Sequence, residues 1–164
     1  MRNKKTLFIT QAAMIAAIYV VLTYFISAFN LASGAIQVRI SEALTILPVF
    51  TPAAIPGLFL GCLLSNLLTG CIIWDVIFGS LATLIGAVGA YLLRRRKWVA
   101  PLAPILANTI VVPFVLSYGY GIPGSIPFFM LTVGIGEVIS CYVLGGILMV
   151  VLGKYKKTIF REEA

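Results

Sequence analysis

Residues 41–69 read SEALTILPVFTPAAIPGLFLGCLLSNLLT, and this apolar run decides how often the chain crosses a membrane. Its Thr51-Pro52 step predicts a break, because proline lacks a backbone N–H and its ring crowds the preceding turn. The run therefore divides into two helices, at about residues 41–50 and 53–69. Two crossings here bring every basic cluster of the chain to one side of the membrane. A single crossing would put the middle cluster outside, against the positive-inside rule.

The composition of the whole chain places it in lipid. Of its 164 residues, 61% are hydrophobic and only 10% are charged, and the mean hydropathy is +1.09. A soluble domain usually carries about 25% charged residues, so these charges are too few to coat a globule. We expect an all-α integral membrane protein of one domain, residues 1–164. Its six expected helices cover residues 6–28, 41–50, 53–69, 72–93, 98–117 and 126–152.

The net charge of +7 lies mainly beside the apolar runs. In a soluble protein it would suggest nucleic acid, but basic residues flanking membrane helices are typical of cytoplasmic anchors. We therefore expect a multi-pass chain in the cell membrane with both termini cytoplasmic and no nucleic-acid partner. The outer loops are then residues 29–40, 69–72 and 117–126. The basic clusters are Arg2, Lys4 and Lys5; Arg94, Arg95, Arg96 and Lys97; and Lys154, Lys156, Lys157 and Arg161.

A few polar residues lie inside the expected helices and need a reason to be there. An ionised side chain at the bilayer centre costs roughly 2.5–3.5 kcal/mol on insertion scales, so it usually faces a cavity or a partner. Judged by position along their helices, Glu137 and Asn108 lie near the midplane. Glu42, Asn66 and Asp75 lie near the outer ends. This distribution predicts a ligand pocket that opens outward and is closed toward the cytoplasm.

The two midplane residues and Asn66 also have structural explanations. Glu137 shares its helix face with Ser140 and Cys141 and could be bonded to a neighbouring helix. Asn108 and Asn66 could form ordinary hydrogen bonds between helices. The intramembrane charge favours a ligand-binding role for Glu137, and the role of Asn108 stays open.

The residues near the outer ends have structural alternatives of their own. Asp75 could complement the dipole of its helix, and Trp74 could mark the membrane interface. Arg39 and Glu42, three residues apart, could simply pair on a helix surface. Alternatively, Arg39, the basic residue expected outside, fixes the loop before the second helix or meets the ligand.

The first expected helix carries two overlapping pairs of small residues. They are Ala12/Ala16 and Ala13/Ala17, each with the spacing that allows helices to approach closely in lipid. The pairs could pack against other helices of this chain or form a docking surface for a partner protein.

Several classes of activity lack their residues. The chain has no histidine, and Cys62, Cys71 and Cys141 are isolated, which argues against a metal site, a redox motif or a disulfide framework. No G-x-x-x-x-G-K-[ST] stretch is present to hold ATP phosphates. We expect neither an enzyme nor a cofactor. A binding pocket with no ATPase and no internal repeat predicts a subunit that other proteins energise.

Four stretches together resemble the QueT family, and the likeness covers essentially the whole chain. The most specific begins at residue 37 with QVRISEAL and continues TILP to residue 48. The others are PG at residues 56–57 with GCLLSN at 61–66, WD at 74–75, and GSLATL at 79–84 followed by the basic run. QueT proteins are substrate-binding S components of energy-coupling factor (ECF) transporters.

The resemblance implies a six-helix S-component fold in the cytoplasmic membrane of a Gram-positive type of bacterium. It implies uptake of a queuosine precursor, preQ1 or queuine, with one transmembrane coupling subunit and two ATPase subunits as partners. S components usually carry an A-x-x-x-A surface on the first helix for the coupling subunit, and both alanine pairs match that spacing. The loaded S component is thought to topple in the membrane and release its ligand inward.

A 7-deazaguanine ligand suits the polar residues of this chain. We expect Glu137 and Asn108 to bind the N–H-rich base, and Asp75 or Glu42 to neutralise the aminomethyl cation. An aromatic residue, Trp74 or Tyr118, could stack on the ring. The rival functions are the same machinery with another vitamin or purine-like ligand, an autonomous carrier or channel, and a membrane scaffold without a ligand.

Overall fold

The computed structural model describes residues 4–28 and 39–159, without the side chains of residues 156–158. Within these ranges the chain is helical and has no β-strand. The expected loop 29–40 therefore lies almost entirely outside the described residues, as do Arg2, Arg161 and the start of the QVRISEAL stretch. The α-helices are α1 (Lys4–Ala28), α2 (Ala54–Leu68), α3 (Ile73–Leu92), α4 (Leu102–Phe114), α5 (Ile126–Glu137) and α6 (Gly145–Ile159).

Three further helical segments have other backbone geometries. The segment η1 (Ile40–Val49) is a 3-10 helix, whereas η2 (Val115–Gly119) and η3 (Val138–Leu144) are π-helical. Because η2 follows α4 directly and η3 joins α5 to α6, these elements form two long continuous helices. Such π-helical turns are rare and occur often at functional sites.

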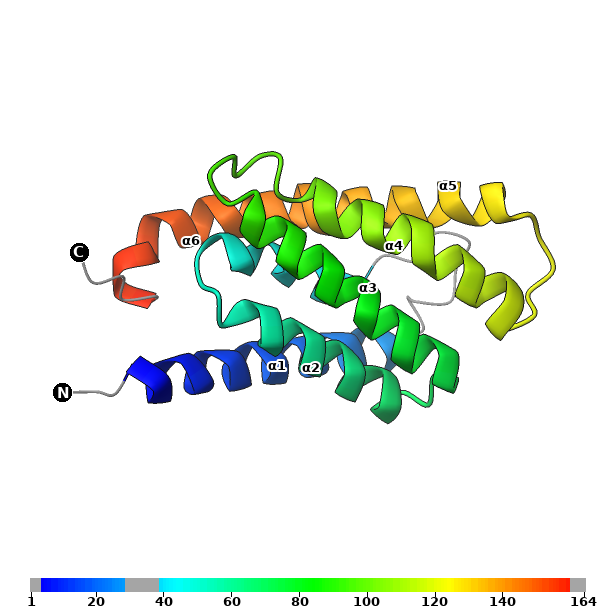
Figure 1. The fold of residues 1–164 in the computed structure, drawn as a ribbon, viewed down its shortest axis with the longest axis horizontal. Coiled ribbons are helices and arrows are strands. Elements are labelled where there is room, and N and C mark those ends of the chain that lie inside the picture. Colours follow the sequence, from blue (N-terminus) through cyan, green and yellow to red (C-terminus); the bar gives the residue numbers. More distant parts are fainter. Residues whose placement is uncertain (1–3, 29–38, 160–164) are drawn as a thin grey trace.

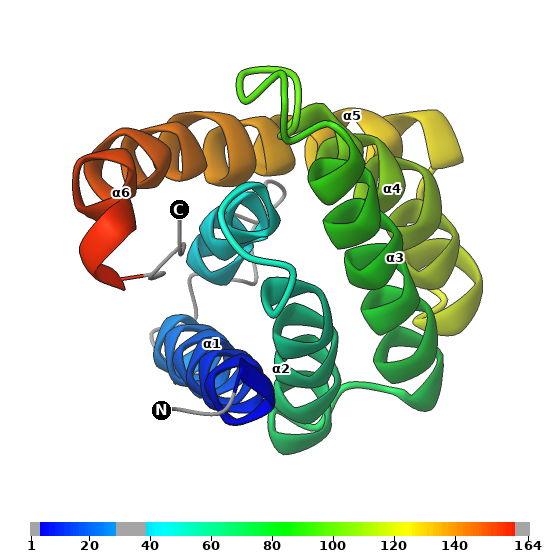
Figure 2. The same cartoon turned by 60° about the vertical axis from the view of Figure 1, so that its left-hand side comes forward.

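The segment η1 forms the centre of the molecule. All its residues from Ser41 to Val49 are buried, and the longer helices surround it as an open ring (Figure 2). Helices that follow one another in sequence pack side by side, from α1 on α2 to α4 on α5. The chain turns between η1 and α2 at Thr51-Pro52, where the sequence predicts the break.

The fifth expected helix begins later than the sequence predicts. It was expected from residue 98, but residues 93–101 form turns and α4 starts at Leu102. Pro101 is the residue just before the helix and Pro104 lies in its first turn. Prolines are tolerated there because the N–H groups of the first turn have no partner within the helix. The basic run Arg94–Lys97 lies in this turn, between the helices as the sequence predicts.

Small residues let α1 and α2 approach closely. A Cβ atom added at Gly57 would come within 2.8 Å of the Ala12 carbonyl oxygen. One added at Gly61 would come within 2.8 Å of the Tyr19 Cβ atom and 3.2 Å of the Ala16 Cα atom. This is the small-residue packing by which helices associate in lipid, where the hydrophobic effect supplies no force between them.

The two ends of the bundle differ in charge. The start of α1, the end of α6 and the turn carrying Arg94–Lys97 lie toward one end, on the left of Figure 1. The links after α2 and after η2 lie toward the other end. Four helices are long and apolar enough to span a membrane: Lys4–Ala28, Ile73–Leu92, Leu102–Gly119 and Ile126–Tyr155. The chain is a multi-pass helical membrane protein, with two shorter apolar helices, η1 and α2.

Candidate functional site

All three acids outside the C-terminal tail are buried in the bundle. The exposed fraction is 1% for Glu42, 5% for Asp75 and 7% for Glu137. Asn66 and Asn108 are buried as well, at 2% and 4% exposed. None of these carboxyl groups faces lipid, and they form two separate centres inside the protein.

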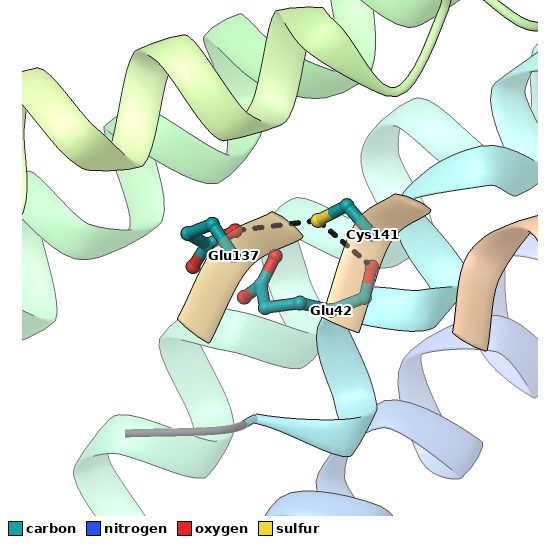
Figure 3. Close-up of side chains that lie close together, drawn as sticks. All are labelled: Glu42, Glu137 and Cys141. Carbon is teal, nitrogen blue, oxygen red and sulfur yellow. Dashed lines mark hydrogen bonds between the residues drawn. The ribbon is translucent and has the colours of Figure 1, made fainter. Parts of the chain in front are cut away.

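The inner centre joins Glu42 of η1 to Glu137 at the end of α5 (Figure 3). The Cys141 Sγ atom donates to Glu137 Oε2 at 3.2 Å and also to the Glu42 backbone carbonyl at 3.6 Å. One carboxylate oxygen of each glutamate and the Cys141 sulfur all lie within 4.8 Å of one another. The amide of Asn108 on α4 is close enough to interact with both carboxyl groups. We call Glu42, Glu137, Cys141 and Asn108 the inner acid centre.

The two oxygens of Glu42 have different surroundings. The Tyr19 hydroxyl on α1 donates to Oε1. In contrast, Oε2 is buried and accepts no hydrogen bond from the described residues. Because a buried acceptor without a partner is costly, this oxygen has a hydrogen-bonding capacity that the described residues leave unused.

Two carboxylates and a thiol are also ligand types for a transition metal such as zinc. In this structure the sulfur lies at hydrogen-bonding distance from Glu137 Oε2 and from the Glu42 carbonyl oxygen. The same carboxyl groups would serve an ammonium group equally well, since it needs only oxygen acceptors. The expectation that the chain holds no metal stays a prediction.

The outer centre lies around Asp75 at the start of α3, and its charge is compensated. The Arg39 Nη2 atom lies 3.9 Å from Asp75 Oδ2, and the Tyr120 hydroxyl donates to the same oxygen at 3.1 Å. The Asn66 amide donates to the Asp75 backbone carbonyl at 3.2 Å. Partial burial and the nearby Asp75 carboxylate raise the pKa of Tyr120, so its phenol keeps the proton that it donates. We call Asp75, Arg39, Tyr120 and Asn66 the outer centre.

A small hollow lies between the two centres. It is lined by Arg39, Gly79, Asn108, Val112, Val133 and Glu137, and its volume is about 10 Å³. This is roughly the space that one water molecule needs. A Cβ atom at Gly79 would come within 2.9 Å of Asp75 Oδ1, so glycine there keeps room beside the outer centre. A bicyclic base can enter only if the surrounding side chains or helices move apart.

Comparison with known proteins identifies the family. Residues 9–154 match the family described as QueT transporter. The chain belongs to this family.

The resemblance drawn from the sequence is thereby confirmed, and the description of this family names a transporter and not an enzyme. It is 37% identical over 99 residues to the Queuosine precursor transporter QueT of Lactococcus lactis subsp. cremoris (strain MG1363). The match covers 59% of this chain and 57% of that relative, less than two thirds of its length. No solved structure matches this QueT-family chain.

The two aromatic candidates line a different hollow from the one between the acid centres. Trp74 is 54% exposed and Tyr118 is 77% exposed. Both line a separate apolar hollow of about 480 Å³ between α3 and α4, together with Phe78 and Phe114. Trp74 stacks on Phe78, and Tyr118 stacks on Phe114. Each of these rings therefore stacks on a neighbouring ring of its own helix, which favours the interfacial role that the sequence left open for Trp74.

The alanine pairs of α1 divide between two environments. Ala16 is buried and Ala12 half-buried, and both face the glycines of α2. Ala13 and Ala17 are exposed, about 100° further around the helix. The internal packing that was one alternative for these residues therefore applies to Ala12/Ala16, and the exposed pair stays available to a partner.

Sequence analysis missed two members of the site. Tyr19 lies 23 residues before Glu42 and Tyr120 lies 45 residues after Asp75. Tyr19 is buried in an apolar helix, and its one signal is that a buried tyrosine hydroxyl needs an acceptor. Tyr120 is exposed in the loop after η2, where no local motif points to Asp75. The sequence places Cys141 on the same helix face as Glu137, four residues further on, and the structure confirms that the two side chains meet.

Proposed function

We propose that this chain captures a queuosine precursor of the 7-deazaguanine type, preQ1 or queuine, from outside a bacterial cell. The observation that carries the proposal is the inner acid centre of this QueT-family chain. In it, one oxygen of Glu42, one oxygen of Glu137 and the Cys141 sulfur lie within 4.8 Å of one another, and all three residues are buried. A 7-deazaguanine presents N–H donors on its base, and carboxylate and amide oxygens accept such donors in pairs. The name of the Lactococcus relative supports the same class of substrate.

The proposed orientation puts both chain termini in the cytoplasm and gives six membrane segments. The basic residues at the start of α1, in the turn after α3 and near the end of α6 lie toward one end of the bundle, as the positive-inside rule favours. The short segments η1 and α2 then enter and leave the membrane as one hairpin. The outer centre faces the outside of the cell and forms the entrance to the inner one.

The hollow between the centres requires an opening step. Its volume of about 10 Å³ is far below the roughly 300 Å³ of a typical small-ligand pocket. We propose that this conformation is the closed, empty one, and that ligand entry separates Arg39 from the helices around Asn108 and Glu137. The cost of opening is met by hydrogen bonds that the ligand makes to groups such as Glu42 Oε2.

Partner subunits supply the energy in this proposal. The sequence holds no ATP-binding motif, so we assign the chain the role of an ECF S component that works with a transmembrane coupling subunit and two ATPases. The exposed Ala13/Ala17 pair is the proposed docking surface. Ala13→Leu with Ala17→Leu is expected to abolish ATP-driven uptake and leave ligand binding intact. Leucines at the equally exposed Val21 and Tyr24 serve as the control.

The direct test is calorimetric titration of the purified chain with preQ1. We expect saturable binding that Glu137→Gln weakens by about 100-fold, because one charged acceptor is lost from a buried site. Glu162→Gln, the same change in the C-terminal tail, is the matched control. Unchanged affinity of Glu137→Gln removes Glu137 from the site. Binding of an unrelated nutrient instead favours the alternative that the same machinery carries another vitamin or purine.

A second candidate function is an autonomous carrier. The two long helices contain π-helical turns, at η2 and η3. These turns favour a carrier, since irregular helices often line transport paths. Proteoliposomes containing only this chain separate the two functions. Ligand accumulation without any partner supports the carrier, whereas uptake that appears only with the coupling subunit and ATPases supports the S component. Absence of any binding favours a scaffold.

A further inference from the structure

The charges around the two centres do not balance. Among the described residues, the centres contain three buried carboxyl groups and one guanidinium, that of Arg39. The stretch 29–38, which precedes Arg39, contains no lysine or arginine. Two carboxyl groups are therefore in excess inside an apolar bundle, where an uncompensated charge is expensive.

The geometry shows which centre lacks the cation. The Arg39 Nη2 atom approaches Asp75 Oδ2, which also accepts from Tyr120, so the outer centre already has a positive partner. Glu42 and Glu137 feel the charge of Arg39 as well, but among the described residues neither forms an ion pair with it. Their hydrogen-bonding partners are the neutral groups Tyr19, Cys141 and Asn108. Glu42 Oε2 has no hydrogen bond within the described part of the chain, although it is buried. The missing positive charge belongs to the inner acid centre.

We propose that Glu42 and Glu137 together form the subsite for a positively charged amino group of the ligand, and that Asp75 does not. This inference rests on the proposed function and specifies which acids read the charge. One carboxylate oxygen of Glu42 lies within 4.8 Å of one of Glu137, a spacing that a single ammonium head can bridge. Asn108, which lines a small hollow with Arg39 and Glu137, is left to bind the neutral base.

The subsite makes charge the basis of selection. A primary ammonium offers three donors and can bridge both carboxylates, whereas a nitrile at the same position offers no donor and no charge. A site built around buried acceptors rejects a ligand that leaves them unpaired. The chain is therefore expected to prefer a 7-aminomethyl-7-deazaguanine over a 7-cyano-7-deazaguanine, although both carry the same bicyclic base.

The test is the ratio of two affinities, measured on the purified full chain with these two compounds. We expect the aminomethyl compound to bind at least about 100-fold more tightly in the wild type. Glu42→Gln and Glu137→Gln are each expected to reduce this ratio to below about tenfold, mainly by weakening the aminomethyl compound. Asp75→Asn tests the competing assignment, in which Asp75 binds the ammonium group. Glu162→Gln removes one acidic charge in the C-terminal tail and is the matched control.

The outcomes separate this inference from the function that it deepens. Equal binding of both compounds by the wild type overturns the charge subsite and leaves queuosine-precursor capture standing. Loss of the ratio in Asp75→Asn but not in Glu42→Gln also overturns it, because the cation then sits in the outer centre. Binding of neither compound removes both proposals. If one glutamine variant does not fold, the other glutamine variant and Asp75→Asn still decide which centre holds the cation.

Discussion

The inner and outer acid centres differ in how their charge is compensated. Asp75 has an ion pair with a guanidinium and a hydrogen bond from a phenol, whereas Glu42 and Glu137 have a phenol, a thiol and an amide and form no ion pair among the described residues. A carboxylate paired within the protein contributes to holding the fold together. A pair of carboxylates without an ion-pair partner can take one from a ligand, which is the role that we propose for Glu42 and Glu137.

The largest expected effect comes from removing both inner acids. Each single change, Glu42→Gln or Glu137→Gln, should weaken preQ1 binding by about 100-fold, or about 2.7 kcal/mol. The double variant should lose about 1,000-fold, less than the product, because both carboxylates bind the same ammonium group and removal of the first already disrupts its site. Calorimetric titration of the four proteins completes the cycle. Fully additive losses would mean that the two glutamates bind separate groups.

A smaller effect is expected in the outer centre, and on stability more than on binding. Arg39→Gln leaves Asp75 buried without its cation and should lower the free energy of unfolding by about 1–2 kcal/mol, allowing for the partial exposure of Arg39. Adding Asp75→Asn should restore part of that loss. Thermal unfolding in detergent measures both. If the stability losses of Arg39→Gln and Asp75→Asn simply add in the double variant, the two residues do not interact as an ion pair.

The two tyrosines allow a matched comparison of the centres. Tyr19 is 1% exposed and Tyr120 is 40% exposed. Removing the buried hydroxyl by Tyr19→Phe should destabilise the protein by about 1.5 kcal/mol, and Tyr120→Phe by about 0.5 kcal/mol, because water can replace the second donor. The same unfolding measurement applies. An equal effect of both changes would mean that water reaches Glu42 as readily as Asp75.

The smallest expected effect concerns the thiol of the inner centre. Cys141→Ser keeps a donor between Glu137 and the Glu42 carbonyl and should change the free energy of unfolding by less than about 1 kcal/mol. Cys141→Ala removes the donor and should cost more than Cys141→Ser. Cys71→Ala, at a half-buried cysteine outside the inner centre, is the control. Equal results for serine and alanine would show that the Cys141 hydrogen bonds contribute nothing.

Sequence reasoning reached the site because acids are rare in this chain. With two of five acids in the C-terminal tail, Glu42, Asp75 and Glu137 were the obvious candidates, and all three are buried. It did not give their partners. Cys141 meets the Glu42 carbonyl across 99 residues, and no local pattern predicts such a contact. It also grouped Trp74 and Tyr118 with the ligand, although both rings are exposed in another hollow.

What the sequence determined by itself is local. Hydropathy and the placement of prolines depend on neighbouring residues, so they gave the membrane class, the break at Thr51-Pro52 and a family likeness that comparison bears out. Only the tertiary structure decided which acid has a cation. Electrostatic compensation depends on distance in space, and packing of η1 within the ring brought Arg39 to Asp75 and left Glu42 beside Glu137.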